Sequence, residues 1–149
     1  DNKDNISLAS MKKYMSGIVI NDDKKKRNAL EKGKQVGLKP NDPAFMTVSL
    51  SGGNAQKVIL ARWMSTDATV MIFDEPTKGI DIGAKADIYL LMEKMAAEGI
   101  AIIMVSSELT EVMGMSDRIL VMSDGKITGE LMKDEFSEES ILNYTVEEN

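Results

Sequence analysis

The sequence predicts an α/β protein in which a parallel sheet is flanked by helices and preceded by a smaller helical region. Three short apolar runs, at residues 70–73, 100–105 and 119–122, have the length and character of buried strands. The segments between them, 83–98 and 107–115, carry apolar residues at helical spacing. Because strands that alternate with helices pair in parallel, ligands are expected at the carboxyl ends of the strands.

Residues 1–45 read as the helical region, and residues 46–149 as the α/β part. A first helical stripe consists of Ile6, Leu8, Met11 and Met15. A second helix is expected to start near Asp22 and Asp23, and the basic run at 24–27 is interpreted as its solvated face. The prolines within 39–43 then break any helix and indicate a connector.

The C-terminal part of the sequence ends in a predicted hairpin and a last helix. Residues 123–126 read as a tight turn that leads from the strand at 119–122 into a second strand at 127–131. Ser137 is followed by two glutamates, as expected where a helix begins, because carboxylates are favourable at the positive end of the helix dipole.

Composition excludes several classes of function. The net charge of −6 argues against binding nucleic acid or anionic membranes through bulk electrostatics. Cysteine and histidine are both absent, which excludes disulfides, thiolate metal sites and histidine acid–base chemistry. No apolar run approaches the roughly 20 residues that span a bilayer, and the first residues do not resemble a signal peptide. A cytoplasmic protein is therefore expected.

The first segment with chemical content is Leu50-Ser51-Gly52-Gly53-Asn54-Ala55-Gln56-Lys57. Two residues without a Cβ allow a large anion to approach the backbone, and the free N–H groups of a following helix would point at that anion. By itself the segment also fits an ordinary turn with a helix cap, which is the commoner meaning of such a pattern.

The second segment is Val70-Met71-Ile72-Phe73-Asp74-Glu75-Pro76-Thr77. Where a buried strand stops, one of two adjacent carboxylates can hold a hydrated Mg²⁺ while its neighbour orients a water molecule. Taken alone, the two acids could equally be polar residues that end a strand. Gly79-Ile80-Asp81 follows, and could be no more than a turn before the next helix.

Together these segments closely resemble the ATP-binding-cassette family: a Leu-Ser-Gly-Gly signature precedes an apolar strand that ends in Asp-Glu-Pro-Thr, and Gly-Ile-Asp follows. The resemblance is strong over residues 46–131. It implies the C-terminal portion of a P-loop NTPase cassette, with residues 1–45 as part of the family's helical subdomain and ATP and Mg²⁺ as ligands of the intact protein.

The resemblance also assigns roles to individual positions. Asp74 matches the Walker B carboxylate that supports Mg²⁺, and Glu75 matches the general base that polarises the attacking water. The signature residues are Ser51, Gly52, Gly53 and Asn54, and their counterparts contact the γ-phosphate of ATP that is held by the opposite cassette. Asp81 matches the loop that links the two ATP sites.

Two departures from the family pattern stand out. The switch position after the next strand, usually histidine, is Ser107, which can donate a hydrogen bond but carries no switchable charge. Such a site is expected to hydrolyse ATP slowly or mainly to bind it, although Ser106 or Ser107 could equally cap the next helix. The sequence also contains no Gly-x-x-x-x-Gly-Lys-Ser/Thr loop, which supplies the phosphate cradle, and no recognisable glutamine loop.

More particular matches point to one branch of the family. Asn54, the segment Lys78–Lys85 and the segment Ser106–Leu109 resemble the second cassette of bacterial sugar importers of the ribose, galactose and xylose type, which fuse two cassettes in one chain. The implied partners are a second cassette, a transmembrane permease and, indirectly, a periplasmic sugar-binding protein, with no nucleic acid. The implied location is the inner face of the cell membrane.

Three alternatives stay open at this point. The chain could act as an isolated non-catalytic interaction module, it could belong to an importer of nucleosides or signalling sugars, or it could come from a soluble cassette protein of translation or DNA repair. The acidic balance and the sugar-importer segments weigh against the last of these.

We predict that the 149-residue chain alone binds Mg-ATP only weakly, because the sequence offers no phosphate-binding loop to hold the nucleotide. Calorimetric titration of the chain with Mg-ATP checks this expectation. Tight binding would show that the phosphates are held by other residues and would contradict it.

Overall fold

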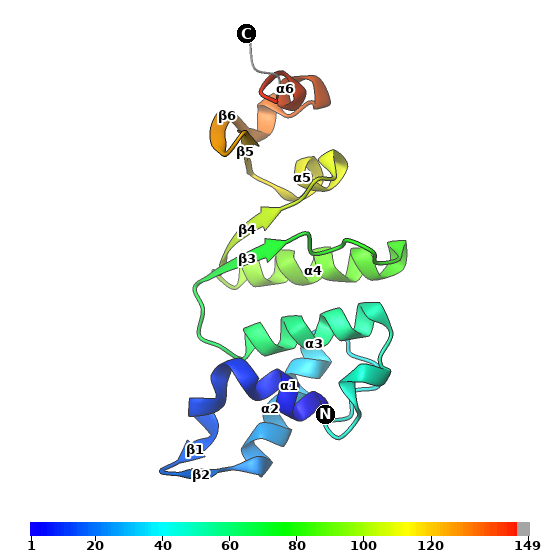
Figure 1. The fold of residues 1–149 in the computed structure, drawn as a ribbon, viewed down its shortest axis with the longest axis vertical. Helices are drawn as coiled ribbons and strands as arrows, with labels where there is room; N and C mark the ends of the chain where they lie inside the picture. Colours follow the sequence, from blue (N-terminus) through cyan, green and yellow to red (C-terminus); the bar gives the residue numbers. More distant parts are fainter. Residues whose placement is uncertain (146–149) are drawn as a thin grey trace. The chain divides into compact units, whose positions relative to one another are not determined.

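The computed structural model describes residues 1–145, which form two compact units. Unit 1 contains residues 1–71 and 79–101, and unit 2 contains residues 72–78 and the described residues from 102 onward. Figure 1 shows the order of the elements along the chain. Within the described part of the chain, none of the helices combines the length and the apolar character that a membrane span requires. The elements of unit 1 before the third strand are α1 (Asn2–Ser7), η1 (Leu8–Tyr14), β1 (Met15–Ser16), β2 (Val19–Ile20), α2 (Asp22–Gln35), η2 (Thr47–Ser49) and α3 (Gly52–Met64). The remaining elements are β3 (Val70–Asp74), α4 (Ile82–Ala97), β4 (Ala101–Val105), α5 (Leu109–Met115), β5 (Arg118–Ser123), β6 (Lys126–Met132), η3 (Lys133–Glu135) and α6 (Glu138–Asn143).

The predicted first helical stripe is only partly correct. Ile6 is fully buried in α1, but Leu8 is 60% exposed and Met15 lies in the short strand β1, at 45% exposure. The reason is a kink at Ser10, whose φ of −122° and ψ of 26° are not helical, within a segment that winds as a 3₁₀ helix. Such a helix has about 3.0 residues per turn rather than 3.6, so residues at α-helical spacing no longer lie on one face.

Helix α2 begins where the sequence indicates. Its cap is Asn21, whose Oδ1 accepts the backbone N–H of Lys24 at 2.9 Å, and Asp22 and Asp23 occupy the first turn. The basic run is not uniformly solvated, however. Lys25 is only 6% exposed and its ammonium donates to the carboxylate of Asp4 in α1, because this face of α2 packs against α1.

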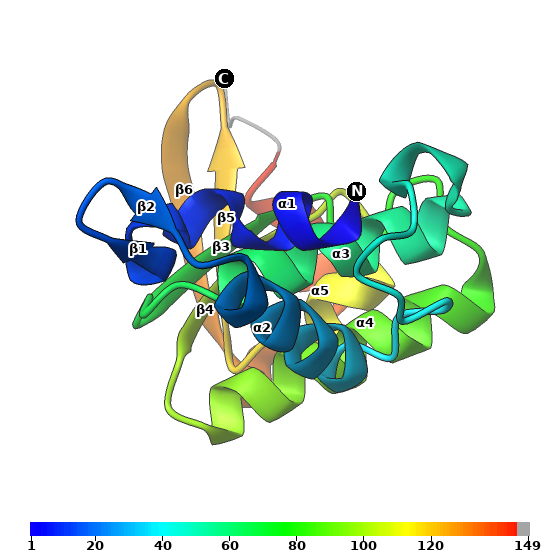
Figure 2. The same cartoon turned by 90° about the horizontal axis from the view of Figure 1, so that it is seen from below.

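A polar network joins α1 to α3 in unit 1, and both helices also pack on α2 (Figure 2). The guanidinium of Arg62 donates to the Asn5 carbonyl at 2.7 Å and to the Asn5 Oδ1 at 2.8 Å. The Asn5 amide donates in turn to Thr47 Oγ1 at 3.1 Å, and this hydroxyl donates to the Asn2 Oδ1 at 2.9 Å. Because buried polar groups are costly unless they are paired, this network fixes one arrangement of α1 against the C-terminal end of α3.

Strands β3 and β4 are neighbours and run in the same direction, as hydrogen bonds at their two ends show. The Ala101 N–H donates to the Thr69 carbonyl at 2.9 Å, and the Glu75 N–H donates to the Val105 carbonyl at 2.8 Å. The expected parallel pairing is therefore present.

The expectation that these strands are buried on both faces is wrong for the described chain. Met71 and Phe73 are buried, whereas Val70 is 51% and Ile72 70% exposed. The residues of β4 alternate between exposed and half-buried. A strand is buried on both faces only where a layer covers each side of the sheet, and the alternation leaves one face of each strand exposed.

The third apolar run does not join this parallel pair in the described residues. It forms β5, which pairs antiparallel with β6, so that Ile119 faces Leu131 and Val121 faces Gly129. The predicted hairpin is thereby confirmed. Its turn residues Asp124 and Gly125 have φ values of 46° and 76°, the left-handed backbone that a tight two-residue hairpin turn requires.

Unit 2 is built on a small apolar cluster that the hairpin shares with α5 and α6. The buried members are Ile119, Val121, Leu131 and Ile141, and Leu109, Val112, Met113 and Phe136 pack against them. Helix α6 begins at the predicted place, because the hydroxyl of Ser137 accepts the N–H of Ser140 at 3.0 Å. Gly129 leaves room for the ring of Tyr144, which follows α6.

We predict that Asp4→Asn weakens the acid dependence of stability. The hydrogen bond from Lys25 lowers the pKa of the Asp4 carboxyl, and the charges of Lys25 and Lys3 act in the same direction. A folded-state pKa below the unfolded value gives stability that is present above the unfolded pKa and is lost as the pH falls through the folded pKa. The variant should therefore be less stable than the wild type at neutral pH and equally stable at strongly acid pH.

Urea unfolding across this pH range measures the difference. Asp117→Asn is the control, because the Asp117 side chain is 100% exposed and lies 3.8 Å from Lys133. A parallel shift of the Asp4→Asn curve at every pH would contradict the assigned role of the carboxylate.

We also predict that Gly129→Ala destabilises unit 2. A Cβ at this position would lie 2.2 Å from Cγ of Tyr144, so the ring must move, at a cost of about 1–3 kcal/mol for overpacking. Chemical denaturation monitored by tyrosine fluorescence reports the loss. Gly114→Ala, at a helical site where a Cβ would meet nothing within 4 Å, should instead be neutral or stabilising.

Candidate functional site

The acidic pair lies where β3 ends, in unit 2. The Asp74 side chain is exposed, whereas Glu75 is half-buried and has a φ of 46°. This left-handed conformation costs about 1–2 kcal/mol for a residue that carries a Cβ. It is held by two backbone hydrogen bonds, in which the Glu75 N–H donates to Val105 at 2.8 Å and its carbonyl accepts from Lys78 at 3.2 Å.

The switch segment follows β4 and lies next to the acidic pair, because of the same hydrogen bond from Glu75 to Val105. Ser106 and Ser107 differ in their surroundings. The Ser106 hydroxyl accepts the Glu108 N–H at 3.1 Å and donates to the Glu111 carboxylate, whereas the Ser107 side chain is exposed. The prediction that one of the two serines caps the helix is wrong, because the N-cap residue of α5 is Glu108, without a side-chain capping hydrogen bond. Ser106 instead accepts the N–H of this N-cap residue.

A buried carboxylate, which sequence reasoning missed, connects the two segments. Glu111 is 4% exposed and its Oε1 accepts the hydroxyl of Thr77, itself 1% exposed, at 2.8 Å. Its other oxygen accepts from Ser106. The sequence offers no signal for this role, because an acid in the first turn of a predicted helix is normally solvated and favourable to the helix dipole.

The signature segment lies in unit 1 at the start of α3. Ser51 is the N-cap residue, but its hydroxyl makes no capping hydrogen bond and instead accepts the side-chain amide of Asn54 at 3.1 Å. The Asn54 Oδ1 accepts the Lys39 N–H at 2.9 Å, which joins the segment to the connector before it. Asn54 therefore orients Ser51, and the first-turn N–H groups of α3 are not capped by the Ser51 hydroxyl.

The two glycines of the signature segment serve different needs. A Cβ on Gly52 would meet nothing within 4 Å, so the backbone here is open to a close approach from outside. A Cβ on Gly53 would lie 3.1 Å from the Cβ of Ala84, so this glycine allows α3 and α4 to pack closely.

Asp81 lies near the same contact, as the N-cap of α4. Its Oδ1 accepts the N–H of Ala84 at 3.0 Å, and Gly79 before it has a φ of 72°, which allows the chain to turn. One turn further along both helices, the Lys57 ammonium donates to Asp87 at 2.7 Å. Within unit 1, Asp81 is thus placed near the signature segment through Ala84, and its role in linking two ATP sites stays a prediction.

The residues of the predicted site therefore fall into two groups. Asp74, Glu75 and Ser107 are brought together in unit 2, and the signature residues with Asp81 are brought together in unit 1. Within residues 1–145 no cluster of three or more metal-ligating side chains is present. A lone exposed carboxylate such as Asp74 still fits Mg²⁺, which commonly binds one or two carboxylates together with water and substrate phosphates.

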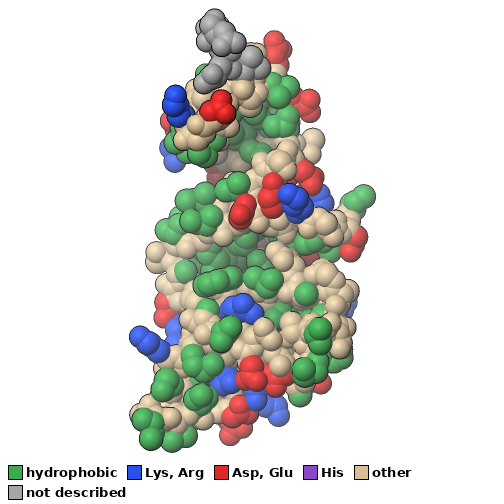
Figure 3. All heavy atoms as spheres, in the orientation of Figure 1, with side chains coloured by type: hydrophobic (Ala, Val, Ile, Leu, Met, Phe, Trp, Pro, Cys, Tyr) green, Lys and Arg blue, Asp and Glu red, His purple; other side chains and the backbone are tan. Residues whose placement is uncertain are grey.

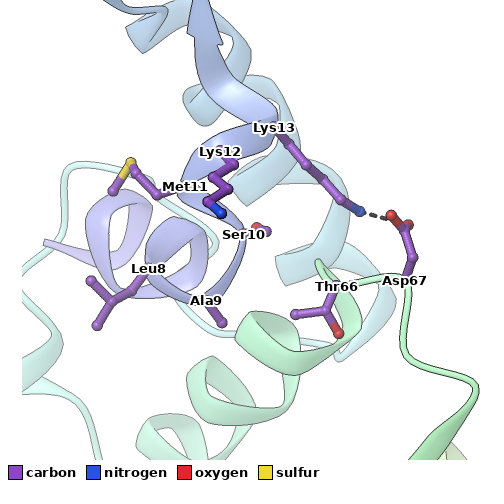
Figure 4. A pocket seen from close by; sticks show the side chains of 8 residues that line it. All are labelled: Leu8, Ala9, Ser10, Met11, Lys12, Lys13, Thr66 and Asp67. Atoms are coloured by element: carbon purple, nitrogen blue, oxygen red, sulfur yellow. Dashed lines mark hydrogen bonds and ion pairs between the residues drawn. The ribbon is translucent and has the colours of Figure 1, made fainter. Parts of the chain in front are cut away.

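A pocket in unit 1 lies elsewhere and contains none of these residues (Figure 4). It is formed by Leu8–Lys13 of η1 together with Thr66 and Asp67 after α3. The Lys13 ammonium donates to Asp67 at 2.6 Å and to the Ser65 carbonyl at 3.0 Å, so its charge is already neutralised. On the face shown in Figure 3, basic and acidic side chains are interspersed.

Comparison with curated proteins finds close sequence relatives. The chain is 48% identical to the ribose import ATP-binding protein of Clostridium perfringens, covering 96% of the chain and 29% of that protein. It is 47% identical to the xylose import ATP-binding protein of Photobacterium profundum, covering 97% and 29%. The arabinose import ATP-binding protein of Pseudomonas savastanoi pv. phaseolicola is also 47% identical, with 96% and 28% covered. The chain thus spans between a quarter and a third of the length of these relatives.

Solved structures show the same fold at lower identity. A dimeric bacterial ABC transporter cassette superimposes with a TM-score of 0.75 at 24% identity, covering 91% of this chain and 57% of the cassette. Another ATP-binding cassette of an ABC transporter gives 0.77 at 20% identity, with 96% and 61% covered. Residues 2–78 in addition match the sequence pattern of the ABC transporter family. The chain therefore belongs to the ABC transporter family.

Proposed function

We propose that this chain is the C-terminal part of an ATP-hydrolysing cassette that drives carbohydrate import. The observation that carries the proposal is the Asp74–Glu75 pair at the end of β3, with Glu75 in a left-handed turn that is hydrogen-bonded to the end of β4. Strained backbone of this kind is found at functional sites, where the surrounding structure holds a side chain in one direction.

Three residues of unit 2 act on the cassette's own nucleotide. Asp74 supports Mg²⁺, which would neutralise charge on the phosphates when bound. Glu75 accepts a proton from the water that attacks the γ-phosphate, and Ser107 donates a hydrogen bond to that phosphate. The exposed positions of Asp74 and Ser107, and the placement of both segments by one backbone hydrogen bond, support this division of roles.

The signature residues act on a second nucleotide, held by the opposite cassette. Ser51 and the backbone of Gly52 contact its γ-phosphate, since the N-terminus of a helix of this length attracts anions and Gly52 leaves the approach open. Asn54 orients Ser51, Gly53 keeps α4 close, and Asp81 connects the two sites. ATP binding would then bring the two cassettes together, and hydrolysis would separate them.

The partners follow from this assignment. They are a second cassette within the same chain of the full-length protein, a transmembrane permease that receives the motion, and indirectly a periplasmic sugar-binding protein. The cassette would lie in the cytoplasm against the permease. The relatives named for ribose, xylose and arabinose import support a sugar as the cargo, which binds to the partner proteins.

We predict that Glu75→Gln in the full-length protein preserves Mg-ATP binding and lowers the hydrolysis rate by roughly 10²-fold or more, as expected for loss of a general base. The protein should then remain in its ATP-bound state. Phosphate release and retention of labelled ATP measure the two effects, with hydrolysis by the other cassette disabled so that it does not mask the loss.

A matched control is available within the same unit. Asp124 has the same φ of 46° as Glu75 and lies in the β5–β6 turn, so Asp124→Asn neutralises an acid on the same type of backbone without touching the site. Its hydrolysis rate should equal that of the wild type. Hydrolysis by Glu75→Gln at the wild-type rate would count against Glu75 as the base.

A further inference from the structure

Among the described residues of unit 2, Glu111 is the most deeply buried acid, and the roles proposed above do not use it. Its carboxylate is 4% exposed and accepts hydrogen bonds from two hydroxyl groups, on Thr77 and on Ser106. An ionised carboxylate is an acceptor only, and burying it is costly unless it receives such bonds. The two donors come from the segments that carry Glu75 and Ser107.

Helix α5 holds this carboxylate in a fixed position. Leu109, Val112 and Met113, on either side of Glu111, pack against the apolar cluster of the β5–β6 hairpin and α6. A side chain in the first turn of an anchored helix is restricted in where it can place its carboxylate. The apolar core of unit 2 is thereby connected, through one side chain, to both segments of the candidate site.

Each of the two donors is also restrained. Thr77 is 1% exposed and follows the fully buried Pro76, and the Ser106 hydroxyl both donates to Glu111 and accepts the N–H of Glu108 at 3.1 Å. The Thr77 hydroxyl is shielded from water and Ser106 is half-buried, so neither hydroxyl easily replaces a lost partner. Removing the carboxylate would leave two buried or part-buried donors without an acceptor.

We infer that Glu111 is a positioning residue for ATP hydrolysis, which sets the distance between the Glu75 turn and the Ser107 segment by bridging Thr77 and Ser106. The inference rests on the proposed function. Glu111 itself neither contacts the nucleotide nor transfers a proton. Its two hydrogen bonds, to Thr77 and Ser106, instead set how the general base Glu75 and the hydrogen-bond donor Ser107 are placed relative to each other.

The test compares variants of the full-length protein, with hydrolysis by the other cassette disabled. Glu111→Ala removes both bonds, and we expect kcat to fall roughly 10-fold to 100-fold, because small misplacements of reacting groups slow the chemistry. The KM for ATP should change by less than about twofold, because Glu111 itself makes no contact with the nucleotide.

Glu111→Gln separates geometry from charge. Its amide oxygen can accept from Thr77 while its NH₂ group donates to the Ser106 oxygen, so the variant should keep kcat within about threefold of the wild type. Glu139→Ala is the matched control, because Glu139 is an exposed acid in the first turn of α6 and tests loss of charge at a helix start alone.

Thr77→Val and Ser106→Ala each remove one of the two hydroxyl groups that donate to Glu111. These variants still test the inference if Glu111→Ala fails to fold. Each should lower kcat at an unchanged KM, and the double variant Thr77→Val/Glu111→Ala should be no slower than Glu111→Ala alone. Multiplying losses in the double variant would show that the two residues act separately and would overturn the inference, as would wild-type kcat in the two single-donor variants.

The wild-type rate distinguishes failure of this inference from failure of the proposed function. A full-length protein that neither binds nor hydrolyses ATP overturns the proposed function and the inference with it. An active wild type with a folded Glu111→Ala variant of unchanged kcat overturns the inference alone. A loss of activity that follows only the folded fraction, measured by thermal unfolding, also overturns it.

Discussion

The candidate site depends above all on the pairing of β3 with β4, which ends in the hydrogen bond from the Glu75 N–H to the Val105 carbonyl. Parallel strands end at the same edge of a sheet, so this bond brings the residues that follow each strand together. It also provides one of the two contacts that hold Glu75 in its left-handed conformation. The bond therefore fixes both the location of the acidic pair and the direction of its second member.

In unit 1 the corresponding constraint is close packing at the start of α3. Gly53 lets α4 approach to the contact with Ala84, and the nearby ion pair of Lys57 with Asp87 maintains the alignment one turn later. The Arg62–Asn5 hydrogen bonds fix the other end of α3 against α1. The helix that begins with the signature segment is thus restrained along its length, which is what a binding segment at its N-terminus requires.

The sequence predicted features that depend on local chemistry and missed those that depend on tertiary contacts. The hairpin turn at Asp124–Gly125 and the cap at Ser137 were predictable because their residue types satisfy the backbone directly. The burial of Lys25 and Glu111 was not, because it depends on partners that are distant in sequence, Asp4 and Thr77. The kink at Ser10 was likewise invisible, since no proline or glycine marks it.

The residues proposed to act on the nucleotide differ in exposure from the residues that hold them in place. Asp74, Ser107, Ser51 and Asp81 have exposed side chains, whereas the side chains that hold the Asp74 and Ser107 segments, Thr77 and Glu111, are buried. Burial strengthens the electrostatic part of a hydrogen bond and removes competing water. The buried hydrogen bond between Thr77 and Glu111 therefore restrains these segments more firmly than a bond at the surface would. The exposed groups remain available for phosphate and Mg²⁺, and they need little reorganisation because their backbones are already fixed. Preorganisation of this kind is the largest contribution a protein makes to phosphoryl transfer, where there is little covalent chemistry for side chains to perform.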